Sequence, residues 1–409
     1  MPEWGDTIDE GGVRRKHYPC HEFQWKVLTS TARFTAAIAG TGGGKTVTGP
    51  LWIAREIARI AQERNLETHP YKCMVVAPTY PILSRATAPE LVRSFRGTAL
   101  EGKYIESRNV YVLPNEMGLI YTLSADNPQG LEGGQIDNVW IDEGGQITYT
   151  AWIALQGRLG AKQGRALITT TPYGENWLFH RFWKNWKKGD PNYAVFTFSS
   201  IANPVYPKEE YERARREMSP QRFSMRYDGE FIRMAGLVFS AWRSCLKMFI
   251  EAPRGTHYGG GDWGWSPSPF AALAAVLDEE DRLWVWYNRS VRNVSVVEHA
   301  KKLPMGVHYF FDPANPEGIE TLRRAGHVVE AARVKSIVVG LDAVYARMAT
   351  GRLIIHPKCR ALLQELSAYR YPEEDDEVLA KEPIGEHHSI DSLRYMISSI
   401  DKLSYAEVA

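Results

Sequence analysis

Short apolar runs alternate with amphipathic stretches over the first half of the chain. Four of these runs have the character of buried strands that end at a polar or turn-forming residue: 34–38 (FTAAI), 73–77 (CMVVA), 138–141 (NVWI) and 166–169 (ALIT). Periodic apolar positions in 51–61 and 211–218 are typical of helices that pack on a sheet. Continuous short apolar strands with helices between them predict a mostly parallel α/β sheet.

The pattern changes after Phe231. Residues 234–256 lack a clear period, and we interpret them as a linker. Strands are predicted beyond them at 259–262, 270–277, 283–287, 307–311 and 353–355, and helices at 294–302, 316–325, 359–368 and from Ser389 onward. This second α/β pattern has an ordinary domain size. The predicted division is a first domain at 1–233, a linker at 234–256 and a second domain at 257–409.

Composition adds limits to this picture. A chain of 409 residues suits two domains, and 44% apolar with 24% charged residues is ordinary globular composition. The net charge of +1 argues neither for nor against nucleic acid. The cysteines are far apart and form no C-x-x-C pair, so neither a zinc site nor a disulfide framework is supported: Cys20, Cys73, Cys245 and Cys359. With no signal peptide and no apolar run near about 18 residues, we expect a soluble protein of a reducing cytoplasm.

The segment 38–46 reads I-A-G-T-G-G-G-K-T and follows the first predicted strand. In a P-loop, G-x-x-x-x-G-K-[ST], backbone N–H groups hold phosphate, the Lys reaches the outer phosphates and the hydroxyl ligates Mg²⁺. Ala39 stands at the first position, so the strict pattern fails by one residue, and a Gly-rich turn with a surface lysine is the alternative. Pro50 is expected to kink or end the helix that follows. The predicted ATP-binding residues here are Gly40, Thr41, Gly42, Gly43, Gly44, Lys45 and Thr46.

A second strand end carries the acidic residues that ATP hydrolysis requires. The strand N-V-W-I leads directly into Asp142 and Glu143, the Walker B arrangement. We predict that Asp142 holds Mg²⁺ and that Glu143 orients the attacking water and accepts its proton. Taken singly, such acidic residues are also common at a helix N-terminus. The combination with a P-loop in one chain predicts an ATPase.

The strand at 166–169 leads into a polar tip, I-T-T-T-P-Y-G. Hydroxyls beside the Walker B strand can sense the γ-phosphate and transmit its loss to the rest of the chain, although P-Y-G alone is an ordinary turn. The predicted coupling residues are Thr169, Thr170 and Thr171.

Three carboxylates in the second half follow or open predicted elements. Asp262 ends G-G-G-D, Asp312 follows F-F, and Asp391 opens the last helix. Carboxylates on separate elements can hold two Mg²⁺ or Mn²⁺ ions about 4 Å apart, which activates water and stabilises the leaving oxygen of a phosphodiester. Each aspartate alone is equally consistent with a turn or an N-cap. On a ribonuclease H-like order of strands with a terminal helix, the three together predict a metal-dependent nuclease. His388, on the same helical side as Asp391, has two open roles, assistance to the metal or a proton and a structural polar contact.

These motifs together resemble the large terminase subunit of tailed double-stranded DNA bacteriophages over nearly the whole chain. The matching stretches are Y-P-C-H-E-F-Q, A-G-T-G-G-G-K-T, V-V-A-P-T-Y, V-W-I-D-E, T-T-T-P-Y-G-E-N-W, Y-D-G-E-F and H-S-I-D-S-L-R-Y. The coupling stretch with T-T-T-P and the closing stretch with H-S-I-D are the specific ones. The resemblance implies that Gln24, in the first stretch, contacts adenine.

The chain departs from the family pattern at positions where many members carry arginine. Thr41 stands inside the Walker A loop, and Glu132 stands before the Walker B strand, a proposed source of the finger that reaches a neighbouring subunit. An arginine finger stabilises charge on the transferring phosphoryl group, so it must come from elsewhere or be weak. Arg158 is the first candidate for the arginine finger, and Arg93 and Arg96 rank after it. The family also often has Asp near Glu386 and His387, so a fourth nuclease carboxylate is in doubt here.

The resemblance implies a P-loop ATPase that moves double-stranded DNA into the procapsid, followed by a ribonuclease H-like endonuclease that cuts concatemeric DNA at initiation and termination of packaging. Implied cofactors are ATP with Mg²⁺ for the motor and Mg²⁺ or Mn²⁺ for the nuclease. Implied partners are the portal protein, the small terminase subunit and further copies of the chain in a ring, with a monomer as the free state. The expected location is the host cytoplasm, docked transiently on the procapsid and absent from the virion. The alternative is an ATP-driven helicase or DNA remodeller whose second domain only binds DNA.

Duplex DNA is held mainly through its phosphates, so basic segments are candidate contacts. The segments 180–188 (HRFWKNWKK) and 212–217 (ERARRE) are the candidates, and amphipathic helices with a hydrated basic face are the favoured alternative for both. The acidic segment 373–377 (EEDDE) is expected to be a loop, or a guard that repels DNA.

Overall fold

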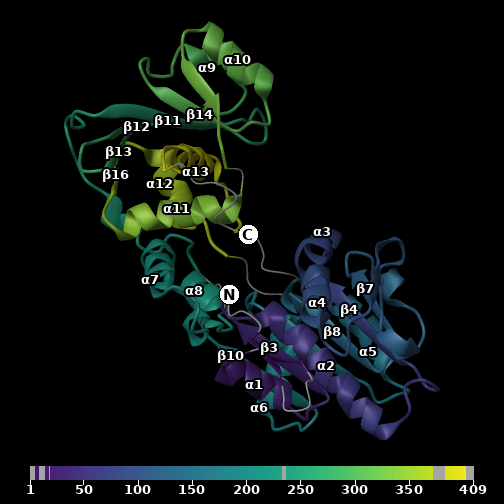
Figure 1. Ribbon diagram of the computed structural model, residues 1–409. Coiled ribbons are helices and arrows are strands. Elements are labelled where there is room, and N and C mark those ends of the chain that lie inside the picture. Colours follow the sequence, from purple (N-terminus) through teal and green to yellow (C-terminus); the bar gives the residue numbers. More distant parts are fainter. Residues whose placement is uncertain are drawn as a thin grey trace. The chain divides into compact units, whose positions relative to one another are not determined.

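The computed structural model describes residues 5–8, 14–17, 19–232, 236–334, 336–371 and 383–401. The acidic segment 373–377 lies outside these residues. The chain forms two compact units, of which the first contains residues 19–212 and 221–232 and the second most of the chain after residue 236 (Figure 1). A short antiparallel pair, β1 (Gly5–Ile8) and β2 (Arg14–His17), precedes the first unit's main sheet.

The main sheet of the first unit has eight strands in the order β10-β3-β9-β8-β4-β7-β6-β5. Neighbouring strands from β10 to β7 run parallel, and the edge strands β6 and β5 are antiparallel. The bounds are β3 (Phe34–Ala39), β4 (Tyr71–Ala77), β5 (Lys103–Ile105), β6 (Val110–Val112), β7 (Gly118–Ser124), β8 (Asn138–Asp142), β9 (Arg165–Thr170) and β10 (Tyr193–Phe198). The mostly parallel sheet and the four predicted strands, which are β3, β4, β8 and β9, are therefore confirmed.

Helices cover both faces of this sheet, because alternate residues of each central strand are apolar on either side. One face packs Trp52 of α2 against Ala37 and Trp140. The other face packs Trp152 of α5 against Ile168. The helices of the first unit are α1 (Glu22–Thr29), α2 (Lys45–Glu63), α3 (Tyr80–Ile82), α4 (Ala88–Phe95), α5 (Tyr149–Leu159) and α6 (Lys184–Lys187). Two further helices, α7 (Lys208–Glu217) and α8 (Pro220–Phe223), follow β10, and residues 213–220 group with the second unit.

Of the two expectations for Pro50, a kink or an end of the helix, the end is wrong. The helix continues through this residue to Glu63. A Cβ added at the neighbouring Gly49 would lie 1.9 Å from the Trp140 ring, so the glycine allows the helix to lie close against the sheet. Each large apolar side chain that α2 buries contributes roughly 1.5–3 kcal/mol, so several together outweigh the cost of about 3 kcal/mol for a proline inside a helix.

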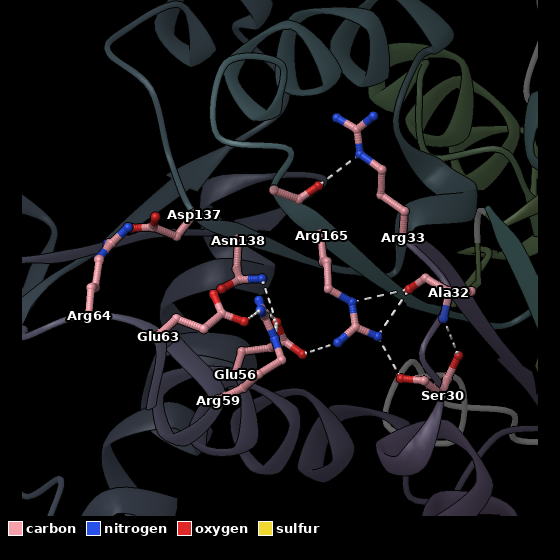
Figure 2. A network of polar contacts seen from close by, with 11 residues as sticks. Ser30, Ala32, Arg33, Glu56, Arg59, Glu63, Arg64, Asp137, Asn138 and Arg165 are labelled. Carbon is pink, nitrogen blue, oxygen red and sulfur yellow. Dashed lines mark hydrogen bonds and ion pairs between the residues drawn. The ribbon is translucent and has the colours of Figure 1, made fainter. Parts of the chain in front are cut away.

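A buried polar network joins α2 to the amino ends of the strands (Figure 2). Glu56 of α2 is 3% exposed and accepts hydrogen bonds from Arg165, the first residue of β9, and from Asn138 Nδ2, the first residue of β8, at 3.0 Å. Arg165 also donates to the carbonyls of Ser30 and Ala32, shortly before β3. One carboxylate thus connects the P-loop helix to three strands whose opposite ends carry the candidate site.

The second unit contains a six-stranded sheet in the order β15-β14-β11-β12-β13-β16. Strands β11, β12 and β13 form an antiparallel meander, while β14 is parallel to β11, β15 to β14, and β16 to β13. The bounds are β11 (Thr256–Asp262), β12 (Phe270–Leu277), β13 (Leu283–Val291), β14 (His308–Phe311), β15 (Val328–Ala331) and β16 (Leu353–Ile355). All five predicted strands of this half are confirmed, and β15 is additional.

Helices cover both faces of the second sheet as well. They are α9 (Val296–Ala300), α10 (Pro316–Arg324), α11 (Ile337–Ala349), α12 (Arg360–Ala368) and α13 (His388–Ile400), with α11 to α13 on one face and α9 and α10 on the other (Figure 1). Helix α13 crosses β11 closely, because a Cβ at Gly260 would lie 1.8 Å from the carbonyl oxygen of Ser392. Helix α11 was not predicted.

The segment interpreted as a linker contributes to the core of the second unit. Phe239, which is 1% exposed, Trp242 and Cys245 pack with apolar residues of α11 and β16. Leu246 also forms a bridge with Ile355. The segment lacks a period because it has no long helix or strand, yet Phe239, Trp242 and Cys245 are buried, whereas Met248 and Ile250 are exposed. Among the described residues, no helix combines the length and the apolar character needed to span a bilayer.

Candidate functional sites

The Gly-rich loop between β3 and α2 has the conformation of a phosphate cradle. Gly42 and Gly44 have φ of 73° and 86°, a region that favours glycine, and Gly44 is the N-cap of α2. The Nζ of Lys45 donates to the carbonyl oxygens of Ala39 and Gly40 at 3.2 and 3.0 Å, so the ammonium group lies over the loop. Backbone N–H groups at the N-terminus of a helix favour an anion at this place.

Helix α1 holds the loop from the other side. The side chain of Gln24 is buried, and its Nε2 donates to the carbonyl of Gly44 at 3.1 Å and to Thr48 Oγ1 at 3.2 Å. His21 Nε2 lies 3.0 Å from the carbonyl oxygen of Gly43. His21 and Gln24 also form a capping box that fixes the start of α1. The structure therefore brings Gln24 to the loop, where its amide nitrogen bonds protein groups.

Asp142 is buried at the end of β8 and is held by neutral donors. Thr87 donates to Oδ2 at 2.9 Å and Thr169 to Oδ1 at 2.8 Å. Burial raises the pKa of Asp142 to about 6, and the neighbouring Glu143 charge adds to that rise, while the two hydroxyls act against it. Burial also lowers the pKa of Lys45, and the charges of Glu143 and Asp142 oppose this. The ammonium and both carboxylates thus share one buried site.

Glu143 is positioned by the coupling strand. It has φ 48° and ψ 42°, a left-handed conformation uncommon for a residue with a side chain. Its Oε2 accepts from the N–H of Thr171 at 3.3 Å and from the hydroxyls of Thr170 and Thr171 at 3.4 Å. Thr170 also accepts from the N–H of Gly145 at 3.0 Å. The Walker B strand end and the threonine tip are therefore one hydrogen-bonded assembly.

Arg158 lies away from the site formed by its own chain. Its carbonyl accepts from the N–H of Ile136, two residues before β8 begins, at the amino ends of the strands, whereas Asp142 ends the same strand. Among the described residues, its buried Nε has no hydrogen-bond partner. A finger from Arg158 would thus have to act on another copy of the chain. Arg93 is paired with Glu90 at 2.8 Å.

Two of the predicted nuclease carboxylates lie at neighbouring strand ends. Asp262 ends β11, and Asp312 follows β14, which is parallel to β11 with Phe311 opposite Gly261. The N–H of Asp312 donates to the carbonyl of Gly261 at 3.1 Å. Parallel strands end at the same edge, so the two carboxylates are adjacent.

Helix α13 brings the third carboxylate and two basic groups to this edge. His388 Nδ1 lies 2.8 Å from Asp262 Oδ2. Arg394 holds Oδ1 of Asp391 through Nε at 2.9 Å. Burial raises the pKa of Asp262, as do the charges of Asp391 and Asp312, and the hydrogen bond from His388 opposes this. That hydrogen bond in turn raises the pKa of His388.

The carboxylates suit a hard divalent cation in their donor chemistry. Nevertheless, no group of three His, Cys, Asp or Glu side chains within the described ranges is close enough to hold a metal ion. The predicted ligand set of Asp262, Asp312, Asp391 and His388 stays a prediction, and two of its carboxylates are bound by His388 and Arg394.

The structure of the first basic segment, 180–188, favours the alternative of an amphipathic helix over that of a DNA contact. Phe182 is 1% exposed in the core, and Nζ of Lys187 lies 4.9 Å from the ring centre of Trp183 and 4.7 Å from that of Trp186. These aromatic rings pack against the protein itself.

Sequence reasoning missed three residues that hold the site side chains. Thr87 contacts Asp142 from 55 positions away, so no local signal marks it. His21 and Arg394 lie within the quoted stretches Y-P-C-H-E-F-Q and H-S-I-D-S-L-R-Y, and the i, i+3 spacing of His21 to Gln24 and of Asp391 to Arg394 was the available signal.

Comparisons with known proteins identify the family. The profile of "Terminase large subunit, T4likevirus-type, N-terminal" matches residues 37–243, just over half of the 409-residue chain. The large terminase subunit of Thermus virus P23-45 is 33% identical over 150 residues, which cover 32% of this chain and only 30% of that protein. The large subunit from Escherichia phage T5 is 22% identical over 81% of this chain and 80% of its own.

Solved structures show the same fold over nearly the whole chain. The large terminase of the thermophilic bacteriophage D6E superimposes with a TM-score of 0.65 at 15% identity, covering 94% of this chain and 99% of its own. Its complex with ADP matches with a TM-score of 0.64. This likeness confirms the predicted two-part α/β fold, and the profile match shows that the chain belongs to the terminase large subunit family.

Proposed function

We propose that this chain is an ATP-driven motor that moves double-stranded DNA into a procapsid and a metal-dependent endonuclease that cuts that DNA. The observation that carries the motor half is the convergence of Lys45 and Asp142, both buried, with the half-buried Glu143 at one edge of a parallel sheet. The ADP complex of the D6E protein supports nucleotide binding by this fold. A helicase or remodeller with an inert second domain is the competing function.

In the motor half, the amides of Gly40 to Gly44 and the ammonium of Lys45 bind the phosphates, and Gln24 lies on the adenine side. Thr46 and Asp142 would hold a magnesium ion, which would supply positive charge beside the phosphates. Glu143 orients the attacking water and accepts its proton. When the γ-phosphate leaves, the hydrogen bonds of Thr169 with Asp142 and of Thr170 and Thr171 with Glu143 pass the change to the chain beyond β9.

The replacement Glu143→Gln tests this assignment. It retains the hydrogen-bond acceptor and removes the base, so kcat for ATP should fall by about 10²- to 10⁴-fold with unchanged ATP affinity. Glu132→Gln, an exposed carboxylate of the same unit, should leave both unchanged. If Glu143→Gln hydrolysed ATP as fast as the wild type, Glu143 would not be the group that accepts the proton of the attacking water.

In the nuclease half, we propose that Asp262, Asp312 and Asp391 hold Mg²⁺ or Mn²⁺, which activates water and stabilises the leaving oxygen. His388 and Arg394 compete with the cation for two of these carboxylates. Asp312→Ala should abolish Mn²⁺-dependent plasmid cleavage and preserve ATP turnover, whereas Glu320→Ala, exposed on α10, should preserve both. A fragment used for this assay should begin before residue 236, because Phe239 and Trp242 belong to the core of the second unit. If Asp312→Ala cleaves normally, the helicase or remodeller becomes the better assignment.

Family membership supports the remaining proposals: duplex DNA, the portal protein and the small terminase subunit as partners, a ring of copies on the portal, and a host cytoplasmic location with transient docking on the procapsid.

A further inference from the structure

The candidate ATP site contains an arginine that the predicted motifs do not assign. The chain has Thr41 and Glu132 at the two places where the family often carries arginine. Hydrolysis of ATP generates negative charge on the transferring phosphoryl group, which a guanidinium stabilises effectively because it offers several donors in a planar fork. Arg226 approaches the P-loop from a different element, the π-helical turn η8 (Ser224–Asp228).

The backbone of η8 is packed directly on the P-loop. The N–H of Thr41 donates to the carbonyl of Arg226 at 2.7 Å. A Cβ at Gly40 would lie 2.2 Å from the carbonyl oxygen of Tyr227, so the two segments are in close contact. Asp228 at the end of η8 accepts a hydrogen bond from the Tyr211 hydroxyl, which anchors the turn. The position of residue 226 is therefore fixed relative to the loop.

The charge of Arg226 acts on the same tyrosine as the charge of Glu143. Burial makes the largest contribution to raising the pKa of the Tyr173 hydroxyl, and the charge of Glu143 adds to that rise. The charge of Arg226 opposes it. Tyr173 follows the threonine tip and accepts a hydrogen bond from Gln146 at 2.6 Å. Arg226 therefore contacts the P-loop through its backbone, and its charge acts at Tyr173, the residue whose pKa Glu143 also affects.

Arg226 is half-buried, and no hydrogen bond or ion pair joins its guanidinium to another residue of the described ranges. Other arginines of this unit, such as Arg93 and Arg165, are paired with glutamates. Partial burial of a cation without a partner is unfavourable, and an anion in the site would relieve that cost. Arg226 is joined through its carbonyl to Thr41, which belongs to the loop proposed to hold phosphate.

We propose that Arg226 is a catalytic residue of the ATPase site that contacts the terminal phosphate of ATP within its own chain. The proposal rests on the ATPase function proposed above. Arg226 would then supply a cation to the ATP site of its own chain. Its position differs from positions 41 and 132, where the family often has arginine and this chain has Thr41 and Glu132. Because ADP has no terminal phosphate, Arg226 should discriminate between the two nucleotides.

The test compares Arg226→Ala and Arg226→Lys with the wild type and with Arg108→Ala, an exposed arginine on the same unit. For Arg226→Ala we expect kcat to fall by about a thousandfold, affinity for ATPγS to fall at least about tenfold, and affinity for ADP to stay within about twofold. Arg226→Lys should recover part of kcat, since it keeps the charge and loses the fork. Arg108→Ala should match the wild type. The bond from Thr41 is to a backbone carbonyl, so the thermal midpoint should not change.

Mixing experiments separate action within the chain from action on a neighbour. Lys45→Ala chains retain Arg226 but lose their own phosphate site. If Arg226 acts in cis, mixing them with Arg226→Ala chains restores nothing, and restored turnover would overturn the proposal. Wild-type kcat in Arg226→Ala, or an equal loss of ADP and ATPγS affinity, would also overturn it. A wild type that binds ATPγS without turnover would refute the ATPase function instead, and the two nucleotide affinities would still decide the role of Arg226.

Discussion

The two units place their charged pairs differently in relation to their candidate sites. In the first unit, Asp142 and Glu143 are held by threonine hydroxyls and a backbone N–H, and the Glu56–Arg165 ion pair lies at the opposite ends of the strands (Figure 2). In the second unit, the acidic residues proposed to bind metal are themselves paired with protein cations, Asp262 with His388 and Asp391 with Arg394.

This difference separates two ways of stabilising a charged site. Where the pairs that support the fold lie far from the site, a bound ligand displaces no ion pair, and changes to the site charges need not weaken the fold. Where the pair is part of the site, a ligand cation must compete with a residue that already neutralises the same carboxylate. The first unit should therefore separate stability from ligand binding, and the second should couple them.

The largest effect is expected from Glu56→Ala in the first unit. It leaves Arg165, which has 15% side-chain exposure, without its carboxylate partner, so the free energy of unfolding should fall by about 3–5 kcal/mol. Urea unfolding measures this loss. Glu63→Ala, on the same helix but in an exposed pair with Arg59, should cost less than about 1 kcal/mol.

Replacing both partners sharpens the comparison. Glu56→Met with Arg165→Met removes the uncompensated charge and should regain most of the loss. ATP affinity of the folded double variant should equal that of the wild type. If the double variant were fully folded but bound ATP much more weakly than the wild type, the ion pair would affect ligand binding as well as stability in this unit.

The residues of this network illustrate what the sequence could predict. The strands β3, β8 and β9 were predictable because each is a short apolar run closed by a polar residue, and the site residues follow such runs. The P-loop and Walker B residues come together because parallel strands end at one edge. The ion pair between Glu56 and Arg165 spans 109 positions and left no local signal.

Other elements were missed for different physical reasons. The edge strands β5 and β6 are three residues each, too short for a clear alternation. Phe239 and Trp242 lie in a segment whose only helix before β11, among the described residues, is the short 3-10 turn Trp242–Cys245, and burial of isolated aromatic residues produces no period. Arg394 was visible in a quoted motif, but only the fold shows that it binds Asp391.

The next effect is a pH dependence that comes from Asp142. The pKa of this carboxyl rises from 3.8 to about 6 on folding, so the native state binds more protons than the unfolded state within that window. Without nucleotide or divalent cation, stability should fall by about 3 kcal/mol as pH rises from about 4 to above 6. In Asp142→Asn the side chain does not titrate, so the free energy of unfolding should decrease less as pH rises.

The measurement is urea unfolding at pH 4.5 and 7.5 in EDTA. Asp142→Asn should be close to the wild type at the lower pH and more stable at the higher one, while losing ATP turnover. If the free energy of unfolding changed with pH in parallel for the wild type and the variant, the pKa of Asp142 would not be raised. The Asp142 carboxylate would then be neutralised by the protein itself, as Asp262 and Asp391 are paired in the second unit.

The smallest effect is expected from Arg394→Met, which tests the coupling in the second unit. Methionine retains much of the buried volume and removes the donors to Asp391, so in EDTA the free energy of unfolding should fall by about 2 kcal/mol. Added Mg²⁺ should recover part of this loss, because a cation can replace the guanidinium beside the carboxylate. Arg347→Met is the matched control: it breaks a buried pair with Asp281 and Asp401, beyond the other end of α13, and Mg²⁺ should not relieve its cost. Equal Mg²⁺ rescue of both variants, or of neither, would mean that Arg394 does not occupy a position for which a metal ion competes.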